Sequence, residues 1–147
     1  MQIIPWLTIF GAWTGLGLIF VGIGSLFRRA LRAPANGAEG LLLSVWLGWI
    51  CTLFFLQIWH LFLPVGPLTI VVVAAFGVIG LAVGGTRPWL NVSRGATRNP
   101  LLMVLGLLLC LWVANRAQSA TVFGDTGGYY IPTVRWLVEY PIVPGLA

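Results

Sequence analysis

Residues 40–63 read GLLLSVWLGWICTLFFLQIWHLFL and contain no Asp, Glu, Lys or Arg. An α-helix needs about 20 consecutive, predominantly apolar residues to cross the hydrocarbon core of a bilayer. The stretch meets that length without help from its neighbours. It therefore predicts a membrane-spanning helix.

The composition of the whole chain agrees with a membrane protein. Hydrophobic residues make up 59% of the 147 residues and charged residues 7%, whereas a soluble domain has about 25% charged residues. The mean hydropathy of +0.99 leaves too little polar surface for a soluble fold. All eight basic residues are Arg, and most lie between apolar segments, where they indicate topology rather than nucleic-acid binding. The expected partner is the lipid bilayer, with no nucleic acid and no cofactor.

Three more apolar segments flank this stretch, at about residues 3–27, 68–86 and 99–115. The last two have short apolar cores and need flanking residues to span. The uncharged LPVGP between the second and third segments predicts an antiparallel hairpin. The predicted fold class is thus all-α: a polytopic membrane protein with about four transmembrane helices in residues 1–115.

Two arginine-rich connections predict the orientation. One carries Arg28, Arg29 and Arg32, and the other carries Arg87, Arg94 and Arg98. If all four segments span, both connections lie on one side, and short loops rich in Arg stay in the cytoplasm. The N-terminus and residues 116–147 are then extracytoplasmic, and we expect a multi-pass membrane protein.

Residues 116–147 form the first large extracytoplasmic loop in this prediction. Asp125 or Thr126 can cap a helix, and Pro132 is tolerated only in a first turn. These signals predict a short amphipathic helix over about 129–140, lying in the membrane interface. Within it Arg135 and Glu139 have the i,i+4 spacing of an ion pair.

Smaller features have structural interpretations. Gly11 and Gly15 have the small-xxx-small spacing that allows close helix approach. Cys51 and Cys110 lie in apolar runs, where cysteines usually serve as small hydrophobic residues, and no ligand spacing predicts a metal site.

The stretch GDTGGYYIPTVRWLVEYPIVPGLA (residues 124–147) resembles the first extracytoplasmic loop of polytopic membrane glycosyltransferases of the GT-C type. More narrowly, it resembles a bacterial family of large GT-C-like membrane proteins. At this place that family has a pattern that begins with Asp-Thr-Gly and continues with an aromatic residue and then Pro or Gln. The pattern goes on with Arg or Lys directly before Trp, and it ends with Glu-Tyr and Val-Pro-Gly-Leu. Residues 56–65, LQIWHLFLPV, are also similar to its second helix and turn. The resemblance implies a protein of the bacterial cytoplasmic (inner) membrane. It also implies that this chain is only the N-terminal part of that protein, inactive alone, with the loop truncated.

The resemblance also implies roles for particular residues. Asp125 matches the acidic residue that in this loop commonly serves as catalytic base or helps to bind the metal or the lipid phosphate. Arg135 suits a lipid phosphate. The Asp-Glu or Glu-Asp doublet of many such loops is absent, so no metal is assigned. The remaining candidates for substrate binding are Tyr129, Tyr130, Glu139 and His60.

Each candidate has a structural alternative. Asp125 can be a helix cap, and Glu139 can be the ion-pair partner of Arg135. Tyr129 and Tyr130 can be interface anchors. His60, three residues after Gln57 near the predicted outer end of its helix, can serve an inter-helix hydrogen bond.

Two functions of different classes remain open. The first is a membrane glycosyltransferase-like protein that uses a polyprenyl-phosphate sugar in cell-envelope glycan synthesis. The second is a small, non-catalytic four-helix subunit of a larger bioenergetic or transport complex. A flippase or transporter half would require ionisable residues at mid-membrane, and only His60, near a helix end, approaches that description.

Overall fold

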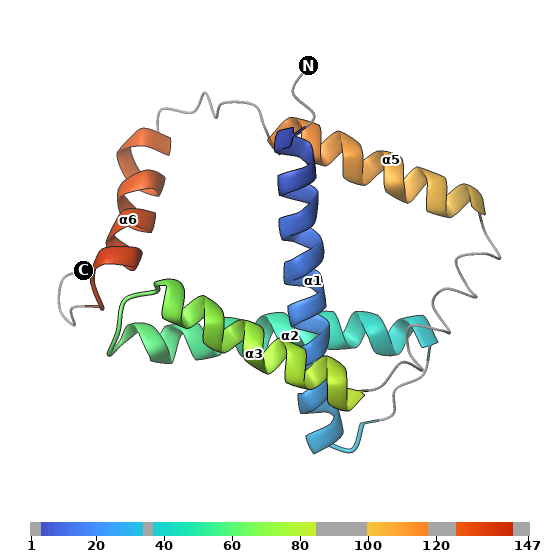
Figure 1. Ribbon diagram of the computed structural model, residues 1–147, viewed down its shortest axis with the longest axis horizontal. Coiled ribbons are helices and arrows are strands. Elements are labelled where there is room, and N and C mark those ends of the chain that lie inside the picture. Colours follow the sequence, from blue (N-terminus) through green and yellow to red (C-terminus); the bar gives the residue numbers. More distant parts are fainter. Residues whose placement is uncertain (1–3, 34–36, 85–99, 118–125, 143–147) are drawn as a thin grey trace.

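The computed structural model of the chain describes residues 4–33, 37–84, 100–117 and 126–142. Within these residues every regular element is helical (Figure 1). The elements are α1 (Ile4–Ala30), α2 (Gly37–His60), α3 (Pro67–Gly84), α5 (Pro100–Ala117), the π-helical turn η1 (Thr126–Tyr130) and α6 (Ile131–Glu139). The all-α fold class expected from the sequence is confirmed.

Four helices, α1, α2, α3 and α5, are long and apolar enough to cross a membrane. The 18 residues of α3 and the 18 of α5 lie at the short end of the spanning range, which is about 17–25 residues. Most of their side chains are exposed, and in α5 the sole buried residue is Ala114. Helices that are apolar on all sides and exposed require hydrocarbon around them. The chain is therefore a multi-pass membrane protein.

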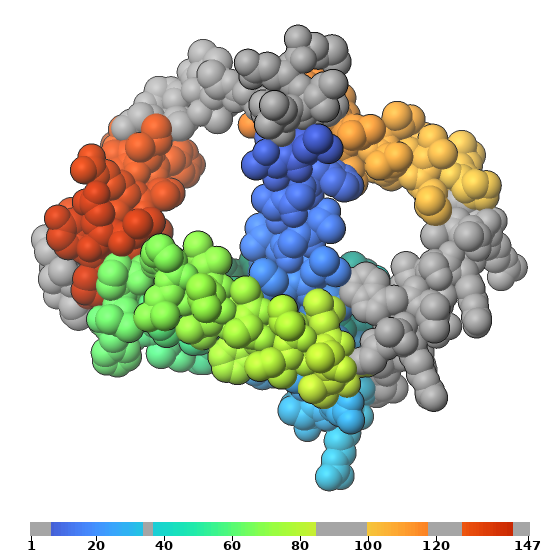
Figure 2. Space-filling model, viewed as in Figure 1, coloured from blue at the N-terminus to red at the C-terminus, as the bar shows by residue number. Residues whose placement is uncertain are grey.

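Helix α1 passes between α2 and α3 and crosses both steeply (Figures 1 and 2). Glycines let the backbones meet. A β-carbon on Gly22 would collide with the backbone of Gly77, and one on Gly24 would collide with the backbone of Ser44. Residues two positions apart point about 200° apart around an α-helix, so Gly22 and Gly24 face opposite sides. Each glycine therefore serves the contact with a different neighbour.

This crossing changes two sequence expectations. Helices α2 and α3 lie on the same side of a tight turn and run in opposite chain directions, as predicted for a hairpin, but α1 lies between them (Figure 1). The step expected at Gly11 and Gly15 is not a helix contact within the described part of the chain, because no described atom lies within 4 Å of a β-carbon placed on either residue. The contact uses the glycines farther along α1, where both neighbours cross it.

Small residues occupy every fourth position of α2 and form the face that receives α1. Gly40, Ser44, Gly48 and Thr52 are all buried, as expected for residues that share one side of a helix. The Ser44 hydroxyl donates to the Gly40 carbonyl at 2.8 Å, and the Thr52 hydroxyl donates to the Gly48 carbonyl at 2.7 Å. Both hydroxyls are thus satisfied inside their own helix, which lets α1 approach closely.

Two adjacent arginines fasten the C-terminal end of α1 to the two flanking helices. Arg28 is buried, and its Nη1 donates to the Gly40 carbonyl and to the Ser44 hydroxyl, the latter at 2.9 Å. Arg29 is exposed, and its Nη1 donates to the Val83 carbonyl at 2.7 Å. Hydrogen bonds from a charged donor are stronger than neutral ones. They fix the rotation of α1 relative to both α2 and α3.

The turn between α2 and α3 is closed by local hydrogen bonds. Trp59 Nε1 donates to the Pro64 carbonyl at 3.2 Å, and the Gly66 N–H donates to Thr69 Oγ1 at 3.3 Å. Pro67 is the first residue of α3, a position where its missing N–H has no helical partner to lose. These bonds fix the conformation of the turn, and the C-terminal part of the chain packs against it.

Candidate functional site

Most of the predicted site residues lie in the C-terminal segment, the name used here for residues 126–142. Its helix begins as the π-helical turn η1 and continues as α6, with Pro132 in the first turn of α6. A proline ring clashes with the carbonyl four residues earlier and supplies no N–H. A wider turn before the proline relieves that clash, as π-bulges do elsewhere. The predicted helix start at Tyr129 or Tyr130 is the junction between the two helical forms.

Helix α6 lacks the predicted side-chain cap at its N-terminal end. Its N-cap is Tyr130, which makes no side-chain capping bond. Asp125, predicted as a cap and as the catalytic base, lies outside the described residues. At the other end the Tyr140 N–H donates to the Trp136 carbonyl at 2.9 Å. Tyr140 itself is extended, and Pro141 follows, so the helix ends where the sequence predicted.

Arg135 and Glu139 form the predicted ion pair. The distance from Arg135 Nε to Glu139 Oε1 is 2.8 Å, and the two side chains are 76% and 42% exposed. The hydrogen bond that Arg135 donates to Glu139, and then the negative charge of Glu139, raise the pKa of the Arg135 guanidinium above its ordinary value. The guanidinium stays charged, and its terminal amino groups are accessible to a ligand arriving from water.

A shallow hollow of about 350 Å³ lies against α6. It is lined by Tyr130, Ile131, Val134 and Arg135. Tyr129 and Tyr130 are both exposed, which suits either of their predicted uses, as interface anchors or as stacking surfaces. The lining is almost entirely apolar, so Tyr130 and Arg135 both line the hollow with carbon atoms. Two of the predicted substrate-binding residues, Tyr130 and Arg135, are thus brought together.

The last described residues, Tyr140–Ile142, lie across the end of α2, and we call them the strap. The Ile142 N–H donates to the His60 carbonyl at 2.8 Å. His60 Nε2 lies 2.9 Å from the Tyr140 carbonyl, and because a carbonyl only accepts, Nε2 carries the hydrogen. A third bond joins the Val65 N–H to the Leu137 carbonyl at 2.9 Å. The strap and α6 are therefore docked on the α2–α3 turn (Figure 1).

His60 is placed differently from the other candidate residues. It is buried, with 4% of its surface exposed, whereas Tyr129, Tyr130, Arg135 and Glu139 are exposed. Gln57, three residues earlier on α2, is also exposed. The structure thus shows the second of the two roles proposed for His60, a hydrogen bond between segments, and gives its ring no open face toward a ligand in water.

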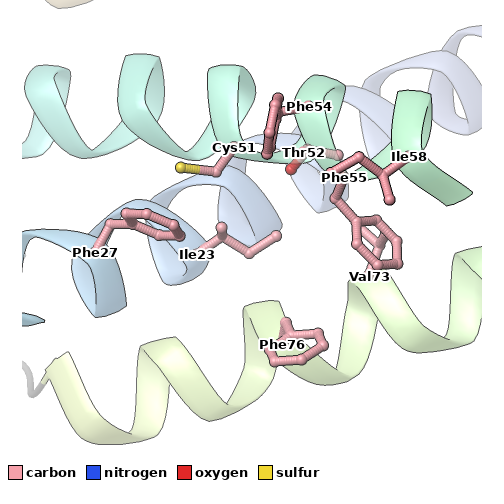
Figure 3. A pocket seen from close by; sticks show the side chains of 9 residues that line it. All are labelled: Ile23, Phe27, Cys51, Thr52, Phe54, Phe55, Ile58, Val73 and Phe76. Atoms are coloured by element: carbon pink, nitrogen blue, oxygen red, sulfur yellow. The ribbon is translucent and has the colours of Figure 1, made fainter.

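An apolar groove lies among α1, α2 and α3 (Figure 3). Its volume is about 300 Å³, and it is only partly enclosed. The lining side chains converge on it from all three helices: Ile23, Phe27, Cys51, Thr52, Phe54, Phe55, Ile58, Val73 and Phe76. The Thr52 hydroxyl is already bonded within α2, so the lining offers hydrocarbon and almost nothing polar. A ligand in this groove would have to be a hydrocarbon chain.

Metal and disulfide chemistry find no support in the described residues. Among them, no three His, Cys, Asp or Glu side chains gather where a metal ion could be held. Cys51 is half-buried in the groove, Cys110 is exposed on α5, and both are free thiols.

Several contacts of this site could not be predicted from the sequence. Val65, Leu137 and Ile142 take part through backbone atoms, which every residue type except proline possesses in full. The sequence signal that did exist is His60, a polar residue at the end of an apolar helix. The two stretches quoted for the family resemblance, residues 56–65 and 124–147, are in contact through their described residues.

Comparison with known proteins gives a family without an assigned activity. No curated protein and no solved structure matches the chain. One family model matches residues 6–147, nearly the entire chain. The chain therefore belongs to the family described as Domain of unknown function (DUF8201).

Proposed function

We propose that the chain belongs to a membrane glycosyltransferase-like protein that uses a polyprenyl-phosphate sugar in cell-envelope glycan synthesis. The observation that carries the proposal is the placement of Arg135. The guanidinium belongs to a side chain that is 76% exposed, and the aliphatic part of that side chain lines the hollow on α6. Helix α6 is docked on the α2–α3 turn at the end of a predicted membrane span. A phosphate at a membrane surface would meet this guanidinium there.

The chemistry of Arg135 suits a phosphate ester. Arginine stays charged and offers donors in a planar fork that matches two phosphate oxygens. Glu139 occupies Nε, and this contact orients the side chain. The terminal amino groups can then bind a phosphate while Nε keeps its carboxylate partner.

The apolar groove supports a ligand that is both lipid and phosphate. It extends along α2 as far as Ile58, two residues before His60, which holds the strap. A hydrocarbon chain in the groove would therefore end near the turn on which α6 is docked. In a bilayer this hydrocarbon chain is already out of water, so the groove would orient it and would add little hydrophobic binding energy.

Asp125 has the proposed role of general base. It precedes Thr126, the first described residue of the C-terminal segment. In the proposed reaction the acceptor hydroxyl oxygen bonds to the anomeric carbon as the bond from that carbon to the phosphate oxygen breaks. The carboxylate of Asp125 accepts the proton of the hydroxyl, and the lipid phosphate leaves with the electron pair of the broken bond.

The test is sugar release from a polyprenyl-phosphate sugar by membranes that contain the natural protein. Wild-type membranes should transfer sugar, and Asp125→Asn should abolish transfer while leaving binding of the lipid phosphate intact. Arg135→Gln should weaken both. Equal transfer by wild-type and Asp125→Asn membranes would contradict the assigned base.

The alternative function, a non-catalytic membrane subunit, is favoured by one observation. Helix α5 has a single buried residue, Ala114, and lies at the edge of the molecule (Figure 2). Such a helix could pack against a larger complex as readily as against lipid. Co-purification of a stoichiometric membrane partner, together with absence of any lipid-phosphate binding, would favour the subunit over the enzyme.

A further inference from the structure

His60 contacts the strap with both its side chain and its backbone. The ring donates from Nε2 to the Tyr140 carbonyl at 2.9 Å, and the His60 carbonyl accepts from the Ile142 N–H at 2.8 Å. These two bonds lie on either side of Pro141. One residue of α2 therefore holds the chain at two points, one before and one after a rigid proline.

In the described part of the chain, the ring of His60 makes the one hydrogen bond to the strap that depends on the residue type at position 60. Within the strap the Tyr140 N–H closes α6 by bonding to Trp136, Pro141 has no N–H, and the Ile142 N–H bonds to His60. Every backbone donor of the strap thus has a partner. The Ile142 bond would form with any residue at position 60. The ring bond to Tyr140 is the part of the docking that depends on residue identity.

Because His60 is buried, its ring depends on the strap for a hydrogen-bond partner, just as the strap depends on the ring for its docking. An unpaired polar group buried beside an apolar span is costly, and only 4% of the surface of His60 is exposed. The Tyr140 carbonyl supplies its partner at Nε2. Removing the strap would leave a buried donor without that partner, and removing the ring would leave the strap held by backbone bonds alone.

We infer that His60 is a positioning residue that sets the place of α6 on the α2–α3 turn, and through α6 the place of Arg135 and Tyr130. It acts through the backbone of the strap and does not touch a ligand. The docking stands on the contacts described here. The statement that it positions a phosphate-binding guanidinium rests in addition on the proposed function.

The first measurement is amide hydrogen exchange of the chain in lipid nanodiscs, followed at Val65 and Ile142. Three variants separate the possibilities. His60→Phe keeps a ring of similar size and removes the donor, His60→Gln keeps a side-chain N–H donor, and Gln57→Ala changes an exposed residue one turn away. In His60→Phe the exchange of both amides should become about fivefold to tenfold faster, as expected for loss of one buried hydrogen bond.

The controls make that result specific. His60→Gln should restore slow exchange at both amides, and Gln57→Ala should leave it unchanged. Amides inside α1, α2 and α3 should keep wild-type exchange in all three variants. Wild-type exchange at Val65 and Ile142 in His60→Phe would overturn the inference, and so would faster exchange spread evenly over the spanning helices, because the ring would then serve the fold as a whole.

A second measurement tests whether the docking positions the guanidinium. The same nanodiscs are prepared with and without polyprenyl phosphate, and its retention by each variant is compared. His60→Phe should retain it about tenfold less tightly, and His60→Gln should recover most of the loss. Unchanged retention in His60→Phe with a released strap would overturn the positioning of Arg135. Absence of retention by the wild type would overturn the proposed function, and the amide exchange would still decide the docking.

Discussion

Gly22 of α1 and Gly77 of α3 lie backbone against backbone, with no room for a β-carbon on Gly22 before the Gly77 carbonyl oxygen. In hydrocarbon, helices gain little from burying apolar side chains, so close backbone packing is a main source of their association. The contact between these two glycines, together with that of Gly24 on the opposite side of α1, therefore holds α1 between its neighbours.

Substitution of Gly22 by Ala should destabilise the helical core. The added methyl group would force α1 and α3 apart, and overpacking of this kind costs about 1–3 kcal/mol. The measurement is the unfolding free energy in mixed micelles of mild detergent and SDS. Gly15→Ala is the matched control, because no described atom lies within 4 Å of that position, and alanine is the better helix former. Equal losses in both variants would show that the crossing is not at Gly22.

Substitution of Arg28 by Gln should be more harmful than the same change at Arg29. Arg28 is buried and donates to Gly40 and Ser44, and hydrogen bonds from charged groups contribute about 1.5–3 kcal/mol each. Arg29 bonds to Val83 from an exposed position, where water replaces the lost partner. Thermal unfolding in nanodiscs should show a clearly lower midpoint for Arg28→Gln. A larger effect of Arg29→Gln would contradict the assigned burial.

The extent to which the sequence predicted this fold depends on how local each determinant is. Apolar runs predicted the spanning helices, because membrane insertion depends on the summed hydropathy of one segment. The ion pair of Arg135 with Glu139 was predictable because i,i+4 neighbours on a helix meet wherever the helix lies. Both determinants are contained within a single element.

The crossing of α1 could not be predicted in the same way. Gly11 and Gly15 have the small-xxx-small spacing that Gly22 and Gly24 lack, yet the partner helices cross α1 at the second pair. The docking of the strap was also missed, because Val65 and Ile142 contribute backbone atoms alone. His60 was identified from its polarity, but its role depends on a contact with Tyr140, 80 positions along the chain.

The contribution of Arg135 to the stability of the C-terminal segment should not change between about pH 5 and pH 9. Glu139 raises the pKa of Arg135. A group with a raised pKa stabilises the fold fully below its unfolded pKa and loses that contribution as pH rises through its folded pKa. For arginine both values lie in strong alkali. Circular dichroism of Arg135→Gln and of the wild type should therefore change in parallel over that range, and divergence of the two profiles within it would contradict the assignment.

The orientation predicted from the arginine-rich connections has a direct test. A cysteine at Thr126, introduced after Cys51 and Cys110 are replaced by Ala, should react with a membrane-impermeant thiol reagent in intact cells. A cysteine at Arg32 should react only after the membrane is ruptured, because short Arg-rich loops stay in the cytoplasm. The opposite pattern would reverse the topology and place the C-terminal segment on the cytoplasmic side.

The central claim is that α6 presents Arg135 to the phosphate of a membrane lipid. The most direct measurement is the affinity of the chain in nanodiscs for polyprenyl phosphate, compared with a polyprenol of the same length that lacks the phosphate. The account predicts that the wild type prefers the phosphate, that Arg135→Gln loses the preference by about tenfold or more, and that Arg116→Gln on α5 keeps it. Equal affinity for polyprenyl phosphate and polyprenol, or an unchanged preference in Arg135→Gln, would contradict the account.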